Sequence, residues 1–319
     1  MRFVWVLSLF LFGGCQSASN SQPAATQQTT NRENADLETV LWDVNQQWLC
    51  SGPYVKPYKD CVEFRSKYWV DQFFEVLPSG ELLNKEEMVA TQTAGIASNP
   101  VPGTGPYPDA FKLRAVYGDF AMATDHTNFK TADKSGKLSF TSNAKVLRLF
   151  VKENGSWRPA AAGLVPIIPP SGPVPPRKHS TTLRKSPNEQ LEKELAEVDR
   201  AWMDSTDMNK RVAYVTKMFA DQWFEILGWD PTANPTKSTT VEILSEFAKA
   251  NTPPGVIADQ FQLQAVFGDV ALATDRRTRT GTNEKGQRVT TAHRSVLVFV
   301  KQNGEWRSAG ASLTPIMSP

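Results

Sequence analysis

The order of apolar and polar positions predicts an amphipathic helix near the start of each half of the chain. Four apolar residues fall at i, i+4, i+7 and i+11 in each half: Leu37, Leu41, Val44 and Trp48, and then Leu191, Leu195, Val198 and Trp202. Residues at this spacing lie along one face of an α-helix. The stripe must bury against another element of the fold.

A second helix is predicted after a short Asp-Gln-aromatic-Phe-Glu strand in each half. In the first half, Asn84 with Glu87 indicates the start of this helix. In the second half, Thr239 and Glu242 have the spacing of a capping box.

Alternating apolar residues then predict long strands joined by tight turns. Gly118-Asp119 has the composition of a two-residue hairpin turn, which places Tyr117 opposite Phe120. In this register Lys112 lies opposite Asp125, away from the apolar face. Further hairpins are predicted at Asn154-Gly155 and Asn303-Gly304. They place a lysine opposite a tryptophan, in the pairs Lys152–Trp157 and Lys301–Trp306.

The two halves are copies of one domain. Residues 111–125 recur at 261–275 with ten of fifteen positions identical, and the whole unit is too long for a solenoid repeat. We therefore expect one domain at 34–167 and another at 188–319, joined by a proline-rich linker at 168–187. We expect the two domains to pack against each other through their sheets.

The element order predicts an α+β fold. Helix, strand and helix precede a run of antiparallel strands, and only the helices are available to cover the apolar face of such a sheet. The expected architecture is two tandem cone-shaped domains, each a curved antiparallel sheet wrapped around its N-terminal helices.

These motifs resemble the nuclear transport factor 2-like superfamily, and within it the SnoaL-like, DUF4440-type branch. The resemblance covers most of both repeats. It rests on the helix ending in Trp, the Asp-x-[Phe/Trp]-Phe-Glu strand, the Ala-Val-[Tyr/Phe]-Gly-Asp hairpin and the Phe-Val-Lys-x-Asn-Gly-x-Trp-Arg hairpin. It implies a cone with a pocket, in a superfamily that includes isomerases, dehydratases, cyclases and non-catalytic binding domains. No catalytic residue is carried over, because fold alone does not select a function.

The N-terminus resembles that of a bacterial lipoprotein. A ten-residue apolar run after Arg2 would span roughly 15 Å, too short to cross a bilayer of about 30 Å. It therefore indicates a signal peptide over residues 1–14, followed by acylation of Cys15 and a flexible tether over 15–33. Gln16-Ser17 favours the periplasmic side of the outer membrane. The alternative is an ordinary signal peptide and a soluble secreted or periplasmic protein.

Charge and cysteine content limit which partners and which bonded groups the sequence predicts. Without residues 1–14 the chain has 34 Lys and Arg against 33 Asp and Glu, which argues against a nucleic-acid partner. Cys50 and Cys61 remain as a pair in an oxidising compartment, where a disulfide is the natural interpretation. A two-cysteine metal site is the alternative, but no histidine lies nearby. No cofactor or metal motif is recognisable.

Glu75 and Glu225 are candidate acid or base residues. They share a strand face with Phe73 and Trp223, where burial beside aromatic rings could raise a carboxyl pKa. The alternative is a structural ion pair with Arg158 and Arg307.

The other candidates are one histidine and a group of aromatic residues. His126 lies on the apolar face near a strand end and is a candidate catalytic residue, although Arg276 replaces it in the second copy. Asp125 and Asp275 are expected at the surface. Six aromatic residues are candidates for lining an apolar ligand pocket or, equally, for forming the core: Trp48, Phe73, Tyr117, Trp202, Trp223 and Phe267.

The sequence therefore predicts an envelope protein, anchored through Cys15, that binds a small apolar ligand or an envelope partner. The alternative is an isomerase- or hydratase-like enzyme that uses a pocket carboxylate or histidine in one domain. The two copies differ at Lys112/Gln262, Arg114/Gln264 and His126/Arg276. We expect any catalytic or binding residues to lie at positions where the copies differ.

Overall fold

The computed structural model describes residues 24–96, 104–133, 135, 137–168, 186–205, 207–227, 234–250, 255–282 and 288–316. The signal peptide, Cys15 and most of the linker lie outside these ranges.

The first half forms helices and a six-stranded sheet with strand order β2-β1-β6-β5-β4-β3. Its elements are α1 (Ala24–Leu49), a 3₁₀ turn (Gly52–Tyr54), α2 (Tyr58–Tyr68), β1 (Phe74–Val76), β2 (Leu82–Asn84), α3 (Lys85–Ile96), β3 (Gly105–Tyr117), β4 (Phe120–Ala132), β5 (Leu138–Glu153) and β6 (Ser156–Ile168).

The second half repeats this plan with a five-stranded sheet of order β7-β11-β10-β9-β8. Its elements are α4 (Glu189–Asp204), α5 (Met208–Met218), β7 (Phe219–Ile226), α6 (Lys237–Ala250), β8 (Gly255–Phe267), β9 (Val270–Thr282), β10 (Arg288–Gln302) and β11 (Glu305–Pro315). Each half is thus an α+β unit with a curved sheet and helices on one face. One parallel pairing in each sheet, β1–β6 and β7–β11, makes the predicted antiparallel sheet a mixed one.

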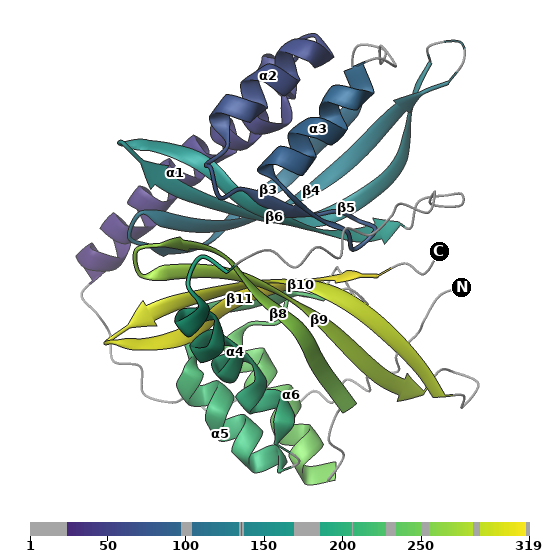
Figure 1. Ribbon diagram of the computed structural model, residues 1–319. Helices are drawn as coiled ribbons and strands as arrows, with labels where there is room; N and C mark the ends of the chain where they lie inside the picture. The colour runs from purple at the N-terminus through teal and green to yellow at the C-terminus, as the bar shows by residue number, and fades with distance from the viewer. Residues whose placement is uncertain are drawn as a thin grey trace.

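The two sheets lie back to back, with helices on both outer sides (Figure 1). Thr314 donates from Oγ1 to the carbonyl of Leu164 at 2.9 Å, and Arg294 donates from Nε to the carbonyl of Gly80 at 3.1 Å. A Cβ on Gly163 would collide with the Ser312 hydroxyl, so the backbones approach closely only because this residue is glycine. Both faces of each sheet are therefore covered, one by helices and the other by the second sheet.

On each edge strand, one backbone N–H donates to a glutamine side chain of the other domain. The N–H of Val116 on β3 donates to Gln222 Oε1 at 3.4 Å, and that of Val266 on β8 donates to Gln72 Oε1 at 3.1 Å. Gln72 and Gln222 occupy equivalent positions, 150 residues apart, so the two domains hold each other's edges reciprocally. A covered edge is a poor template for pairing with another chain.

The first helix is longer than predicted. Residues 24–33, expected as part of a flexible tether, form the first turns of α1. Alanine and glutamine are good helix formers, and extending an existing helix needs no new nucleation. Helices α2 and α5, which follow the first helix of each half, were not predicted either.

The helix starts were predicted correctly in one copy only. Asn84 and Glu87 form a reciprocal capping box, in which each side chain accepts from the other residue's backbone N–H at 2.7 and 2.9 Å. In the second copy the start lies three residues earlier than predicted. The hydroxyl of Thr236, rather than that of Thr239, accepts from the first turn of α6.

The hairpin turns are confirmed, but one predicted register is wrong. Tyr117 pairs with Phe120, Lys152 with Trp157 and Lys301 with Trp306. Lys112, however, lies opposite Thr124 rather than Asp125, because the register of β3 shifts between Leu113 and Ala115. A bulge of this kind changes the residue opposite without changing the turn.

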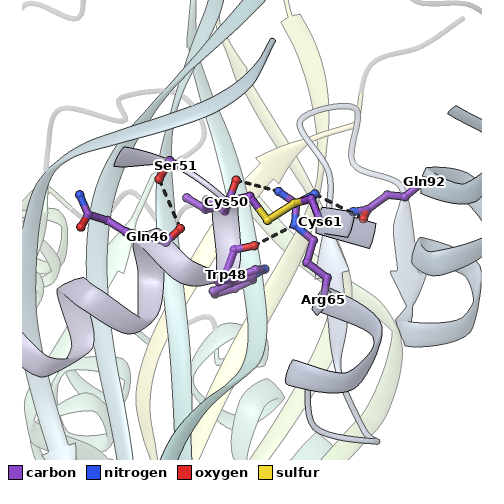
Figure 2. Close-up of a disulfide and its surroundings, with 8 residues drawn as sticks. Gln46, Trp48, Cys50, Ser51, Cys61, Arg65 and Gln92 are labelled. Carbon is purple, nitrogen blue, oxygen red and sulfur yellow. Dashed lines mark hydrogen bonds between the residues drawn. A yellow bond between two sulfur atoms is a disulfide. The ribbon is translucent and has the colours of Figure 1, made fainter. Parts of the chain in front are cut away.

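The predicted disulfide is confirmed between Cys50 and Cys61, and it joins the end of α1 to α2 (Figure 2). Beside it, Arg65 donates to the carbonyls of Trp48 at 2.8 Å and Leu49 at 2.9 Å (Figure 2). The second copy has Arg211 at the position of Cys61, and its guanidinium donates to the carbonyls of Met203 and Ser205 at the end of α4. An arginine thus holds the end of the first helix in both copies, and only the first copy adds a covalent bond.

Candidate functional site

The helix-facing side of the first sheet carries a buried polar group centred on Asp125. Its Oδ2 accepts from Arg148 Nε at 2.8 Å and from Asn45 Nδ2 at 2.9 Å, and its Oδ1 accepts from the Thr127 hydroxyl at 2.8 Å. Asp125 is completely buried, so its expected surface position is wrong. The physical reason is that both sheet faces are buried, and the face assigned to solvent is the one that meets α1.

Glu75 lies in the same row of the first sheet as Arg148, since both residues pair with Ala162. Burial raises the pKa of Glu75, Arg148 and Arg65 oppose the shift, and Asp125 adds to it. The suggested partner Arg158 is wrong. It binds Glu153 at 2.9 Å and backbone carbonyls at the end of α2 instead.

Aromatic residues fill the rest of the first cone. Trp69 stacks on Phe73 with ring centroids 4.3 Å apart, and Trp48 meets Phe73 edge-on at 5.6 Å. The guanidinium of Arg148 lies 4.6 Å from the centre of the Trp48 ring. Trp48 and Phe73 therefore belong to a packed core in which each side chain is almost fully buried.

The second cone has a different buried polar group, centred on Arg277. Its guanidinium contacts Asp199 at 2.8 Å, Asp275 at 2.9 Å and Glu225 at 3.7 Å. The predicted ion pair between Glu225 and Arg307 is wrong. Glu225 pairs instead with Arg277, which lies on another strand of the same sheet. One cation here faces three carboxylates.

This charge arrangement shifts the pKa values of the buried groups. Burial raises the pKa of Asp199 to about 8, Arg277 opposes this shift, and Asp275 adds to it. Burial alone would lower the pKa of Arg277, but Asp275, Asp199 and Glu225 together raise it, so that the guanidinium stays charged.

Comparison of the copies locates where their interiors differ. The helix-facing exchanges from the first copy to the second are Asn45 to Asp199, Thr127 to Arg277, Ala144 to His293, Val146 to Ser295 and Arg148 to Leu297. Four of these five exchanges place an ionisable or hydroxyl group where the first copy has an amide, a hydroxyl or an apolar side chain. His293 and Ser295 are both buried, and the Ser295 hydroxyl has no hydrogen-bond partner among the described residues.

Two of the three differences singled out from the sequence preserve a contact, whereas Lys112 lies 3.5 Å from Glu38 in an ion pair that Gln262 cannot form. Arg114 donates to the Thr124 hydroxyl at 2.8 Å, and Gln264 donates to that of Thr274 at 2.9 Å.

The exchange of His126 for Arg276 likewise keeps an ion-pair geometry with the equivalent aspartate. His126 lies 4.0 Å from Asp109, and Arg276 lies 3.5 Å from Asp259. His126 is 45% exposed and lies on the sheet face turned away from Asp125, so the structure does not place it in the cone.

The remaining aromatic candidates are scattered. Tyr117 and Phe267 pack against the core where the two sheets meet, and burial raises the pKa of Tyr117. Trp223 is buried in the second cone, where it packs on Phe219 at 4.6 Å and donates to the Ser308 hydroxyl at 3.2 Å. The side chain of Trp202 lies outside the described part of the structure.

Two clefts follow the boundary between the domains rather than the cone interiors. One, of about 480 Å³, is lined by Phe73 and Lys85 of the first domain and by Leu263 and Gln264 of the second. The other, of about 290 Å³, lies between the start of α1, β3 and Gln222.

The described ranges contain neither a metal-binding cluster nor a membrane-spanning helix. No group of three or more His, Cys, Asp or Glu residues there is arranged to hold a metal ion. None of the helices within those ranges is both long and apolar enough to cross a membrane.

Comparison with known proteins finds similarity at the level of solved structures. No family model and no curated protein matches the chain. Aln2 from a Streptomyces species matches 41% of this chain and 94% of its own length, with 16% identity and a TM-score of 0.34. An NTF2-like protein from Cytophaga hutchinsonii matches 40% of this chain and 99% of its own, with 15% identity and a TM-score of 0.33.

An NTF2-like superfamily protein from Salmonella enterica serovar Typhimurium shows a similar match. It covers 40% of this chain and 93% of its own length, with 17% identity and a TM-score of 0.33. Similarity at this level assigns neither an activity nor a ligand, so a function must be argued from the chain's own residues.

Proposed function

We propose that this protein is a lipid-anchored cell-envelope module in which the second domain binds a small ligand and the first serves as a packed scaffold. The observation that carries the proposal is the one-sided exchange of interior residues. Asp199, Arg277, His293 and Ser295 replace less reactive residues of the first copy. Asp199 lies on α4, and the other three lie on the helix-facing side of the sheet in the same domain.

The energetics of burial support this division of roles. In the first cone, both oxygens of Asp125 already accept hydrogen bonds from side chains of the protein, namely Arg148, Asn45 and Thr127. In the second, the Ser295 hydroxyl is fully buried without a partner among the described residues, and such a group costs about 1–3 kcal/mol. A ligand that is mostly apolar, with one polar group for the Ser295 hydroxyl, would match the chemistry of this site and of Trp223 in the same domain.

The ligand can be tested with matched variants of equivalent residues. Protein purified from its own envelope would be examined by native mass spectrometry, as wild type, Glu225→Gln and Glu75→Gln. We expect a bound species of defined mass in the wild type, loss of that species in Glu225→Gln, and its retention in Glu75→Gln. Consistently empty protein, or equal loss in both variants, would overturn the proposal, and empty protein would favour docking of an envelope partner.

Anchoring rests on the sequence of residues 1–15 alone. Cleavage before Cys15 and its acylation would attach the protein to the outer membrane, facing the periplasm. Cys15→Ser should move the protein from the membrane fraction to the soluble fraction. Persistent membrane association of Cys15→Ser would refute the anchor.

A second candidate, an isomerase- or hydratase-like enzyme, is favoured by one observation. The pKa of Asp199 is raised to about 8, which suits an acid or base working near neutrality. Such an enzyme would exchange substrate hydrogen with solvent. Deuterium incorporation into the co-purified ligand should then occur with wild type and cease with Asp199→Asn, whereas a binding module would show no incorporation with either.

A further inference from the structure

We propose that Asp199 and Asp275 of the second domain share one proton at neutral pH, so that this cone contains a neutral carboxylic acid where the first cone contains an amide. The shared proton attaches α4 to the sheet and makes this attachment sensitive to pH. The shared proton requires no bound ligand and is independent of the proposed function.

The geometry of the two carboxyl groups carries the proposal. Arg277 donates from one nitrogen to Asp199 Oδ1 at 2.8 Å and from another to Asp275 Oδ2 at 2.9 Å, so one guanidinium holds both carboxyl groups. Their other oxygens, Asp199 Oδ2 and Asp275 Oδ1, are buried and have no hydrogen-bond partner in the described part of the chain. Two ionised carboxylates only accept hydrogen bonds, whereas a single proton lets one oxygen donate to the other.

The balance of charge points the same way. The sheet contributes four titratable or charged groups around Asp199: Arg277 and Asp275 on β9, Glu225 on β7 and His293 on β10. The helices contribute Tyr214 on α5 and Arg200 on α4 itself. Arg294 lies beyond Asp275, on the opposite face of β10. Within the contact itself, three carboxylates meet one guanidinium. In the first cone, Asp125 and Glu75 face two arginines, Arg148 and Arg65. The second cone therefore has an excess of negative charge that a proton reduces.

In the first copy, the equivalent hydrogen bond between helix and sheet does not depend on protonation. Asn45, equivalent to Asp199, donates from Nδ2 to Asp125 Oδ2 at 2.9 Å. An asparagine amide has nearly the shape of a protonated aspartate, and it donates at any pH. In the second copy the same contact depends on a proton that can leave.

The direction of the pH effect follows from linkage. Burial and Asp275 raise the pKa of Asp199 from 3.8 to about 8, so the folded state binds more protons than the unfolded chain between these values. The contribution of the proton to stability is complete below about pH 4 and is lost as the pH rises towards 8. Above that pH, three carboxylates repel one another at the contact between α4 and the sheet.

Infrared spectroscopy of the full-length protein can test the shared proton directly, through the C=O absorption of a protonated carboxyl group. Because burial also raises the pKa of Glu75, the measurement is made in a Glu75→Gln background. We expect a carboxylic-acid band at pH 7 that disappears as the pH rises through about 8. Adding Asp199→Asn or Asp275→Asn should abolish the band, and adding Asn45→Asp should introduce a second one.

Hydrogen exchange provides the second measurement. Amides of α4 should lose protection between about pH 6 and 9, after correction for the intrinsic exchange rate, and Asp199→Asn should flatten this dependence. The absence of a carboxylic-acid band at pH 7, or a band unchanged by both Asp199→Asn and Asp275→Asn, would overturn the shared proton. Protection of α4 that falls equally in Asp199→Asn would overturn the pH-sensitive attachment.

Discussion

Replacement of Arg148 by leucine should strongly destabilise the first domain. Arg148 and Asp125 are almost completely buried, and their side chains meet at 2.8 Å. Removing the cation leaves Asp125 with only Asn45 and Thr127 as donors, and breaking one partner of a buried ion pair costs about 3–5 kcal/mol. Leucine is the natural choice because Leu297 occupies this position in the second copy.

Protonation sets an upper limit on the loss. A buried carboxylate without its cation can be neutralised by taking up a proton, which at pH 7 costs an aspartate of ordinary pKa about 4 kcal/mol. The same uptake costs little near pH 4. Arg148→Leu should therefore lose about 3–4 kcal/mol at pH 7 and less than about 1 kcal/mol near pH 4.5, relative to wild type at each pH.

The second copy supplies a rescue. There, Arg277 occupies the position of Thr127 and binds the equivalent aspartate at 2.9 Å. Arg148→Leu with Thr127→Arg transfers this arrangement into the first domain and should recover at least half of the loss at pH 7.

Urea unfolding at both pH values, followed by tryptophan fluorescence, measures each variant. A loss below about 1 kcal/mol at pH 7 would show that Arg148 does not hold Asp125. A double variant no more stable than Arg148→Leu would show that the two arginine positions are not interchangeable.

Three further perturbations test the helix ends, the sheet contact and the strand edges. Cys50→Ala with Cys61→Ala should lower the free energy of unfolding of the first domain by about 2–3 kcal/mol. The domain should stay folded, because Arg65 still binds the backbone carbonyls at the end of α1. Complete unfolding, seen as loss of the near-ultraviolet circular dichroism of this domain, would refute the role of Arg65. Gly163→Ala should lower the free energy of unfolding by about 1–3 kcal/mol, because the added methyl group collides with the Ser312 hydroxyl. Adding Ser312→Ala should restore part of the lost stability. Thermal melts that show no change in Gly163→Ala would contradict the close contact between the sheets. Gln72→Ala with Gln222→Ala should leave the backbone N–H groups of Val116 on β3 and Val266 on β8 without these acceptors and promote self-association. A double variant that stays monomeric by light scattering at all concentrations would count against edge protection.

Much of the fold was predictable because its signals are local. The stripe ending at Trp48, the turn at Gly118-Asp119 and the capping box of Asn84 and Glu87 each depend on residues close in sequence. Duplication repeated the stripe and the turn, but not the capping box. Helices α2 and α5 were missed although they too are local, since their apolar positions form no long stripe.

The candidate site was predictable only in part. Glu75 and Glu225 do lie inside the cones, as the strand pattern indicated, but the arginines Arg148 and Arg277 beside them come from distant strands. Arg148 and Arg277 stand at different positions in the two copies yet bind equivalent aspartates. No comparison of aligned positions could have paired them.

The sequence by itself determined the duplication, the first helix of each half, the hairpin turns and the cysteine pair, because these follow from local spacing and composition. Only the tertiary structure decided which sheet face is buried, since the second sheet covers the face that a single domain would leave to solvent. The packing of the first helix of each half against its own sheet turned Asp125 and Asp275 from expected surface residues into members of buried polar groups. It also moved the meaningful difference between the copies from His126 and Arg276 to Asn45 and Asp199, where one proton separates an amide from an acid.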